Sequence, residues 1–422
     1  MKTVNYPGRK AEELISRTNL DYNQVLESVR PIVEDVRKNG DKALTKYTRK
    51  FDKYSLSPGN MRVTEKEIKA ASQRIPTIVK ALKKAHKNIK AFHSIQYKEI
   101  DAEWDYYVEE GVKVGEKTTP LKSVGCYAPG GLASYPSTVL MNCVPAKIAG
   151  VERIAVASPP PIPDAVLAAA KIAGADEVYR MGGAQAIAAL AYGTRHVQPV
   201  DKIVGPGNKY VTAAKMLVYG TVDIDMPAGP SEILIIADSS AKPSIIASDL
   251  LAQAEHDPNA QCILATDSPK LVKAVNSELE AMIRASGRSE ILKKSRENMA
   301  AVIVKNKRFA VEYANKYAPE HLEILVKNPT KIAAEIRNAG AVFLGPYSPV
   351  AAGDYASGGN HVLPTSGAAR FSSPLSVRDF LKTTCVQEMT KEGLKRLSNT
   401  IITLAQEEGL LEHRKSVQER LK

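Results

Sequence analysis

Four histidines in the last 170 residues of the chain stand in sequence contexts that could do chemistry: His256, His321, His361 and His413. Three of them directly follow a glutamate, so an imidazole neighbours a carboxylate along the chain. An imidazole changes charge near neutral pH and can therefore transfer protons or bind a metal ion. A structural histidine is the better interpretation of any one of them, but the four together favour a functional site.

Gln253 and His256 stand three residues apart near a predicted helix end, so their side chains share one face. The amide oxygen and the imidazole could both reach one metal ion. Asp354, in a glycine-rich loop, and His413 are further candidate ligands. A set without thiolates suits Zn²⁺ or a harder divalent ion. No standard zinc pattern such as HExxH is present, so the spacing alone does not establish the site.

Glu320 and His321 form an adjacent acid–base pair at the predicted junction of a helix and a strand. A positioned carboxylate can activate water, and a neutral imidazole can accept a proton near pH 7. A capping glutamate followed by a buried histidine remains the alternative interpretation.

Phosphate-binding signals are incomplete. Gly205 to Tyr210 reads G-x-G-x-x-Y, which lacks the third glycine of the dinucleotide fingerprint, and an ordinary turn is at least as good an interpretation. Neither a G-x-S-x-G elbow nor a P-loop occurs, which argues against a serine hydrolase and a nucleoside triphosphatase.

Length and composition describe an ordinary globular protein. The chain has 422 residues, 44% of them hydrophobic and 25% charged, which excludes collagen-like, coiled-coil and disordered chains. No run approaches the ~18 apolar residues of a membrane span, and the first residues lack the apolar core of a signal peptide. The four cysteines form no CxxC pair, so we expect a reducing, cytoplasmic environment.

The order of the predicted strands and helices that would position these residues indicates an α/β fold. From residue 121, short β-rich runs alternate with alanine-rich helical stretches, which is typical of parallel sheets covered by helices on both faces. We expect a mainly helical region (1–120), with one helix beginning near Pro76, and a first α/β domain (121–230). A second α/β domain (231–373) and a helical C-terminal segment (374–422) follow. Both α/β domains would be Rossmann-like but without the full dinucleotide fingerprint. The apolar tail must dock on its own body or on a partner.

Several long strings together resemble the histidinol dehydrogenase family. They are Gly125-Cys126-Tyr127-Ala128-Pro129-Gly130-Gly131, Gly182 to Leu190, Val204 to Val211, Ile224 to Glu232 (which includes Ala228), Gln253 to Pro258, Tyr317 to Glu323 and Gly353 to Thr365. The resemblance runs from near residue 28 to His413, almost the whole chain.

This resemblance implies a role for each matching residue. The catalytic pair would be Glu320 and His321, and the ligands of one Zn²⁺ per subunit would be Gln253, His256, Asp354 and His413. Contacts to NAD would come from Tyr127, Gln185 and Asn208. The substrate site would be bordered by Ser137, Ser231, Gln253, His256, His321, Asp354, His361, Glu408 and His413.

The resemblance also implies the reaction and the assembly. L-histidinol would be oxidised through L-histidinal to L-histidine, the last steps of histidine biosynthesis, with two NAD⁺ reduced. The resemblance further implies an intertwined homodimer, in which Glu408 and His413 of one subunit would complete the site of the other. His321 suits the base for the hydroxyl proton, and Glu320 suits the activation of water. Neither Cys126 nor Cys143 is needed in this scheme.

Two other functions fit parts of the sequence. A zinc-dependent hydrolase could use Glu320 and His321 on water without a dinucleotide. A nucleic-acid-binding protein would suit the net charge of +12. However, the basic residues are scattered over helix faces, and only 6% of residues are aromatic. We therefore expect neither a nucleic-acid nor a membrane partner, and we interpret the charge as a surface property.

Overall fold

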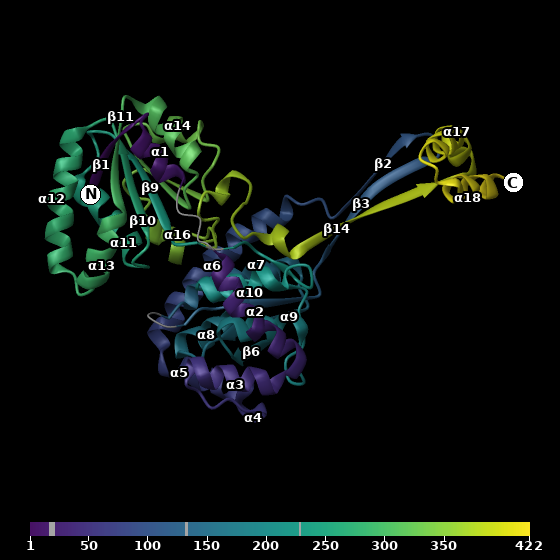
Figure 1. Ribbon diagram of the computed structural model, residues 1–422, viewed down its shortest axis with the longest axis horizontal. Coiled ribbons are helices and arrows are strands. Elements are labelled where there is room, and N and C mark those ends of the chain that lie inside the picture. The colour runs from purple at the N-terminus through teal and green to yellow at the C-terminus, as the bar shows by residue number, and fades with distance from the viewer. Residues whose placement is uncertain (17–21, 131–133, 228) are drawn as a thin grey trace.

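The computed structural model of the chain describes residues 1–16, 22–130, 134–227 and 229–422. Gly131 and Ala228, which belong to two of the strings quoted above, lie outside the described residues. Two α/β bodies lie against each other, and a long arm projects from them to one side (Figure 1). The predicted α/β class with two parallel sheets is confirmed.

The first body is built on five parallel strands in the order β6-β5-β4-β7-β8. These are β4 (Ser123–Tyr127), β5 (Arg153–Ser158), β6 (Glu177–Arg180), β7 (Lys202–Val204) and β8 (Asp223–Ile224). The helices between them are α7 (Pro136–Ala149), α8 (Asp164–Ala173), α9 (Gly183–Tyr192) and α10 (Lys209–Val218).

N-terminal helices cover the outside of the first body, with α2 against α9 and α10, α5 against α8, and α6 against α7. They are α2 (Tyr22–Asn39), α3 (Asp41–Asp52), α4 (Pro58–Met61), α5 (Glu65–Arg74) and α6 (Pro76–Lys98). The predicted helix start at Pro76 is confirmed. No helix among the described residues combines the length and the apolarity that a membrane span needs.

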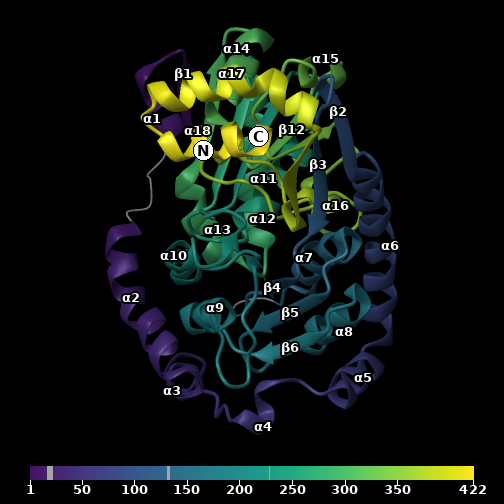
Figure 2. The same ribbon diagram turned by 90° about the vertical axis from the view of Figure 1, so that its right-hand side faces the viewer.

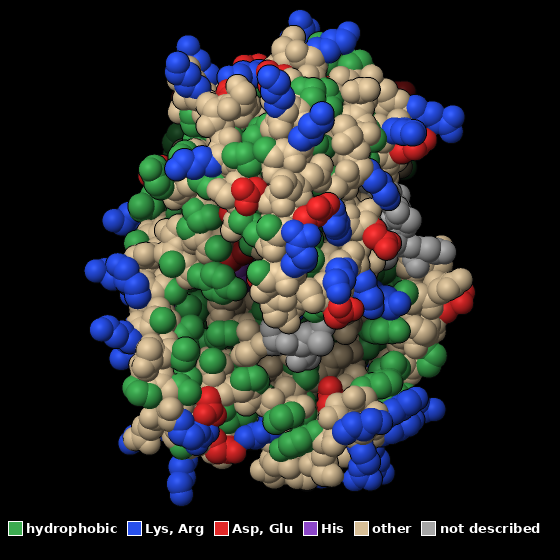
Figure 3. Space-filling model, turned by 90° about the vertical axis from the view of Figure 1, so that its left-hand side faces the viewer, with side chains coloured by type: hydrophobic (Ala, Val, Ile, Leu, Met, Phe, Trp, Pro, Cys, Tyr) green, Lys and Arg blue, Asp and Glu red, His purple; other side chains and the backbone are tan. Residues whose placement is uncertain are grey.

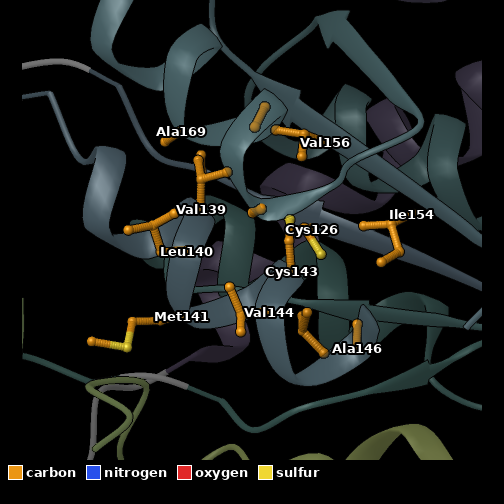
Figure 4. Packing of buried hydrophobic residues seen from close by; sticks show 14 of the residues in the cluster. Cys126, Val139, Leu140, Met141, Cys143, Val144, Ala146, Ile154, Val156 and Ala169 are labelled. Carbon is orange, nitrogen blue, oxygen red and sulfur yellow. The ribbon is translucent and has the colours of Figure 1, made fainter. Parts of the chain in front are cut away.

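Both faces of the first sheet are buried, so successive strand residues enter different cores. In β4, Cys126 packs with Cys143 and Ile154 on the side of α7 and α8, whereas Tyr127 packs with Ala155 on the side of α9 and α10. Figure 4 shows Cys126 and Cys143 beside each other among apolar side chains. Burial raises the pKa of the Cys126 thiol, which therefore stays neutral and packs as a small apolar group.

The second body is built on six parallel strands in the order β1-β11-β10-β9-β12-β13. These are β1 (Lys2–Tyr6), β9 (Glu232–Ala237), β10 (Gln261–Thr266), β11 (Met299–Val304), β12 (His321–Leu325) and β13 (Ala341–Leu344). The α-helices are α1 (Arg9–Ser16), α11 (Pro243–Ala254), α12 (Pro269–Ala285), α13 (Ser289–Ser295), α14 (Lys307–Tyr317), α15 (Pro329–Ala333) and α16 (Val350–Tyr355). Short 3₁₀ turns lie at η1 (Arg296–Asn298), η2 (Ala368–Arg370) and η3 (Val377–Phe380).

The arm is an antiparallel sheet that carries two helices at its far end (Figures 1 and 2). Its strands are β2 (Glu103–Glu109), β3 (Val112–Pro120) and β14 (Leu381–Met389), and its helices are α17 (Lys391–Glu407) and α18 (Leu411–Leu421). The sequence analysis expected helices in both of these regions, and it missed these strands and β1. No residue of β2 is buried within the chain, but Trp104, Tyr106 and Val108 stand at alternate positions of the strand, so a strand signal was present in the sequence and was overlooked.

The strands of the two parallel sheets lie within the two predicted α/β segments, except for one strand at the N-terminus. All five strands of the first sheet fall within 121–230, and those of the second fall within 231–373 apart from β1. We propose the boundaries near residues 120, 230 and 373 as the domain limits, with β1 assigned to the second domain.

His93 ties the two bodies together beside the segment that leads to His361. It lies fully buried on α6, with Nδ1 2.7 Å from Gln96 Oε1 and Nε2 3.4 Å from Asn360 Nδ2. Asn360 also donates to the Met141 carbonyl at 2.7 Å. Since the amide oxygen of Gln96 only accepts, His93 donates through Nδ1 and accepts at Nε2, so the ring is neutral. Burial lowers its pKa, and the bond to Gln96 opposes this more weakly.

This burial predicts acid sensitivity. As the pH falls through the unfolded-state pKa near 6.5, the unfolded chain takes up a proton at His93 before the folded chain does, so the free energy of unfolding decreases. Urea unfolding between pH 7 and pH 5 should therefore show a shallower loss of stability in His93→Gln than in the wild type. Parallel curves for the two proteins would contradict a neutral, buried His93.

Candidate active site

A cavity of about 490 Å³ runs along the edge strand β13 and reaches His321 at the amino end of β12. Its lining includes His321, Phe343, Asp354, Asn360 and His361. Ligands of parallel α/β sheets usually bind at the carboxyl ends of the strands. His321, by contrast, lies at the amino end of its strand, where the chain arrives from helix α14.

His321 is the first residue of β12 and is only 5% exposed. Its Nδ1 lies 3.0 Å from the backbone carbonyl oxygen of Glu232, at the start of the neighbouring strand β9. Because a carbonyl oxygen only accepts, Nδ1 carries the hydrogen and Nε2 is the bare, basic nitrogen. Nε2 is buried without a hydrogen-bond partner among the described residues, and it lies 3.8 Å from Asp354 Oδ1.

The electrostatic surroundings keep the His321 ring neutral. Burial lowers the pKa of His321 to about 4, and the nearby His256 and His361 lower it further, against the opposing effect of the bond to Glu232. A neutral imidazole with one bare nitrogen can accept a proton throughout the physiological pH range.

Glu320 directly precedes β12 and is 7% exposed. Its Oε2 accepts the backbone N–H of Glu232 at 2.8 Å and lies 3.6 Å from His321 Nδ1. The first residue of β9 therefore fixes both members of the pair, Glu320 through its amide and His321 through its carbonyl. The predicted helix–strand junction at this pair is confirmed.

His361 connects the cavity to the first body. Its Nδ1 donates to the Asp354 backbone carbonyl at 2.9 Å, and its Nε2 lies 3.3 Å from the Thr138 hydroxyl of α7. Burial lowers the pKa of His361 to about 4, so this ring is also neutral. Ser137, the other site residue predicted on α7, directly precedes Thr138 and is 9% exposed. Ser231 stands directly before β9.

The predicted metal ligands of the second body come from three separate elements. Gln253 is buried near the end of α11, His256 lies in the turn that follows, and Asp354 lies on α16. The His256 side chain reaches solvent, but the surrounding protein lowers its pKa. Burial alone raises the pKa of Asp354 to about 7, so its carboxylate would be stabilised by a bound cation. An amide oxygen, an imidazole and a carboxylate therefore fit Zn²⁺ as an incomplete ligand set.

The remaining predicted ligand, His413, and the predicted substrate contact Glu408 are not brought to this cavity within one chain. Both are exposed at the far end of the arm, which Figure 1 shows projecting away from the second body. Consistently, the described residues of a single chain contain no group of three His, Cys, Asp or Glu side chains placed to hold a metal ion.

The predicted NAD contacts lie on the first body, at the carboxyl ends of its strands. The Tyr127 hydroxyl accepts the Gly183 N–H at 3.1 Å, and Gln185 Nε2 donates to Asp52 at 3.3 Å. Burial raises the pKa of Asp52 to about 6, and Asp52 in turn helps to raise that of Tyr127. The structure therefore brings Tyr127 and Gln185 together around the half-buried carboxyl group of Asp52.

Asn208 lies at the neighbouring junction of β7 and α10. Its side-chain oxygen caps α10 by accepting the N–H groups of Tyr210 and Val211 at 3.0 and 3.2 Å. Because the strand order reverses between β4 and β7, this junction and the end of β4 flank the crevice where parallel sheets bind nucleotides. Tyr127 and Asn208 therefore lie beside the reversal of the strand order, whereas Gln185 lies on α9, which follows the edge strand β6.

A buried ion pair holds the loop before Asn208. Lys215 Nζ contacts Asp225 and donates to the Gly205 carbonyl at 3.1 Å, while the Gly205 N–H donates to Asp225 at 2.7 Å. Gly205 has φ +114°, and a Cβ there would overlap the Tyr127 carbonyl oxygen, so only glycine fits.

A buried acid–base pair beside a cavity, and an adjoining parallel sheet whose strand order reverses between β4 and β7, are features of an α/β dehydrogenase, which is an oxidoreductase. The family model of histidinol dehydrogenase matches residues 15–421. Histidinol dehydrogenase of Methanothermobacter thermautotrophicus is 50% identical to the chain, covering 100% of the chain and 99% of the relative. That of Methanococcus maripaludis is 48% identical, covering 98% and 97%.

The fold agrees with these relatives. The crystal structure of histidinol dehydrogenase from Elizabethkingia anophelis superposes with a TM-score of 0.93 at 37% identity, covering 100% of this chain and 98% of that one. The chain belongs to the histidinol dehydrogenase family.

Sequence reasoning missed the groups that hold the predicted site in place. The Glu232 backbone and the Thr138 hydroxyl act through contacts between strands and between bodies that are distant in the sequence. The only available signal was local, since Thr138 adjoins Ser137 and Glu232 adjoins Ser231.

The buried ion pair gives a quantitative prediction. Lys215 is 2% exposed, so Lys215→Met would leave Asp225 buried without its cation and should lower the free energy of unfolding by about 3–5 kcal/mol. Lys415 is matched to an exposed partner, and Lys415→Met should cost no more than about 0.5 kcal/mol. Denaturant titrations measure both, and equal small effects would show that the buried pair is not structural.

Proposed function

We propose that the chain oxidises L-histidinol through L-histidinal to L-histidine, with bound Zn²⁺ and the reduction of two NAD⁺. The observation that carries this proposal is the His321 ring, which is neutral, fixed through Nδ1 and bare at Nε2 inside a cavity. Membership of the histidinol dehydrogenase family supports the choice of substrate.

His321 would serve the first oxidation. Removal of hydride from an alcohol carbon requires that the hydroxyl proton leave to a base. Nε2 is the atom that can accept it, since Nδ1 is already committed to the Glu232 carbonyl. The proton would then sit 3.8 Å from the Asp354 carboxylate, which stabilises the imidazolium.

Glu320 would serve the second oxidation. An aldehyde must be hydrated before a second hydride can leave, and a positioned carboxylate can take a proton from the attacking water. Glu320 is held by the Glu232 N–H, so its position does not depend on the substrate.

Both absent groups have sites of suitable chemistry. Zn²⁺, when bound by Gln253, His256, Asp354 and a fourth ligand, would hold the imidazole and amino nitrogens of the substrate. NAD⁺, when bound near Tyr127, Gln185 and Asn208, would accept hydride. The chain's own residues orient the substrate and move its protons.

A second copy of the chain would supply the fourth ligand. The arm exposes an apolar surface that its own chain leaves uncovered, with Tyr106 66%, Tyr107 61% and Leu404 57% exposed. Surfaces of this kind mark interfaces. In a homodimer the arm of one subunit would lie on the body of the other and bring His413 and Glu408 to its cavity. We propose that this dimer works in the cytoplasm, where the free cysteines would stay reduced.

The alternatives fit less well. A zinc hydrolase would leave the Tyr127–Gln185 crevice unexplained. A nucleic-acid-binding protein would carry its basic residues clustered on one surface. On the face drawn in Figure 3, Lys and Arg side chains are instead dispersed among acidic and apolar ones.

One assay tests the proposal. Protein, histidinol and NAD⁺ should produce NADH, a chelator should abolish the reaction, and added Zn²⁺ should restore it. Full activity of the metal-free protein would contradict the zinc assignment, and absence of NADH formation would contradict the dehydrogenase.

The two acid–base residues should separate the two oxidations. Glu320→Gln should slow the oxidation of added histidinal by about 10²–10⁴-fold, because water activation is lost, and slow the oxidation of histidinol much less. Stopped-flow NADH formation from each substrate measures this, with exposed Glu335→Gln as the control. Equal loss of both steps would exclude the division of roles.

Completion of the site by a second subunit predicts complementation. Asp354→Asn damages the body, and His413→Ala damages the arm, so each protein alone should be inactive. Mixed, denatured and refolded together, they should regain about a quarter of wild-type activity, because each heterodimer contains one intact site. No recovery would mean that His413 acts within its own chain, and full activity of His413→Ala alone would mean that it has no role.

A further inference from the structure

Two carboxyl groups, a buried one on Glu323 and a partly buried one on Asp249, face each other behind the candidate active site. Asp249 on α11 lies within hydrogen-bonding range of Glu323 on β12. Glu323 is 1% exposed, and its Oε1 accepts the backbone N–H of Val350, the first residue of α16, at 3.0 Å. One carboxyl pair thus joins α11, β12 and α16.

Each of the three contacting residues lies on the same element as a residue of the candidate site, about one helical turn or one strand repeat away from it. Asp249 precedes Gln253 by four residues on α11, and Val350 precedes Asp354 by four on α16, so each couple shares a helix face. Glu323 follows His321 by two residues and points to the same side of β12.

The pair needs a proton. Among the described residues, no ion pair to Glu323 is present: Asp249 approaches from α11, the apolar Ile235 and Phe343 flank it on β9 and β13, and α16 contributes the Val350 N–H. On its own strand the nearest titratable group is His321, which is neutral. Oε2 of Glu323 meets no donor among the described residues.

Two carboxylates in such a place repel each other, so one of them stays protonated. Burial raises the pKa of Glu323, and the negative charge of Asp249 raises it further. The protonated Glu323 can donate to Asp249 while its other oxygen still accepts from Val350.

We propose that Asp249 and Glu323 share one proton and act as positioning residues that set Gln253, His321 and Asp354 relative to one another. This inference rests on the proposed function, since those three residues are the ones that it assigns to metal and proton transfer. It adds two residues that touch neither substrate nor metal.

Three variants of the full chain test it. Glu323→Gln keeps one donor and one acceptor without a charge, so it should replace the protonated acid. Glu323→Ala removes both contacts. Ile324→Ala makes a cavity on the opposite face of the same strand, where Ile324 is fully buried, and controls for simple loss of stability.

The readouts are Zn²⁺ retention against a chelator, kcat, and the infrared band of a protonated carboxyl group at pH 7. We expect Glu323→Ala to lose Zn²⁺ at a chelator concentration about 10–100-fold lower than the wild type and to lose kcat similarly. Glu323→Gln and Ile324→Ala should stay within about threefold of the wild type. The band should be weaker in Glu323→Gln than in the wild type.

Each failure has its own signature. Equal zinc retention and kcat in Glu323→Ala and wild type would overturn the positioning role. A Glu323→Gln protein as impaired as Glu323→Ala, or an unchanged carboxyl band, would overturn the shared proton. A wild type that binds no Zn²⁺ would contradict the proposed function instead, and the infrared band would still decide the protonation of the pair.

Discussion

The backbone of Glu232 at the start of β9 is the fixed point of the active site. Its carbonyl accepts from His321 Nδ1, and its N–H donates to Glu320. The parallel pairing of β9 with β12 sets both contacts, because it places His321 opposite Ile233. If the His321 ring turned, it would lose this hydrogen bond and leave the N–H of Nδ1 without its acceptor inside the protein. The tautomer of the imidazole is therefore determined by the fold.

Burial then determines the charge. Three histidines, His93, His321 and His361, have lowered pKa values because protein replaces the water around them. Asp354 has a raised pKa for the same reason. Because burial disfavours the charged form of Asp354, a cation bound beside this carboxylate would stabilise its charged form. The incomplete ligand set and the exposed arm both support our proposal that a second copy of the chain completes the site.

The sequence predicted what depends on neighbours along the chain. The strand–helix alternation, the helix start at Pro76 and the junction at Glu320 and His321 follow from local patterns, and all three are present. The arm strands were missed, although Trp104, Tyr106 and Val108 stand at alternate positions of β2 and give a strand signal. The contacts of Glu232, Thr138 and Glu323 could not be foreseen, since they depend on the register of β9 with β12 and on the packing of separate elements. Backbone donors and acceptors, moreover, are the same at every position of a sequence.

The proposed chemistry depends on the protonation state of the His321 ring, which ¹⁵N NMR of histidine-labelled protein measures directly. The His321 resonances are those missing from a His321→Gln spectrum. At pH 7 we predict a neutral ring with hydrogen on Nδ1 and a bare Nε2, unchanged down to about pH 5 because its pKa is lowered to about 4. A hydrogen on Nε2, or an imidazolium at pH 7, would contradict it, because Nε2 could then accept no proton from the substrate.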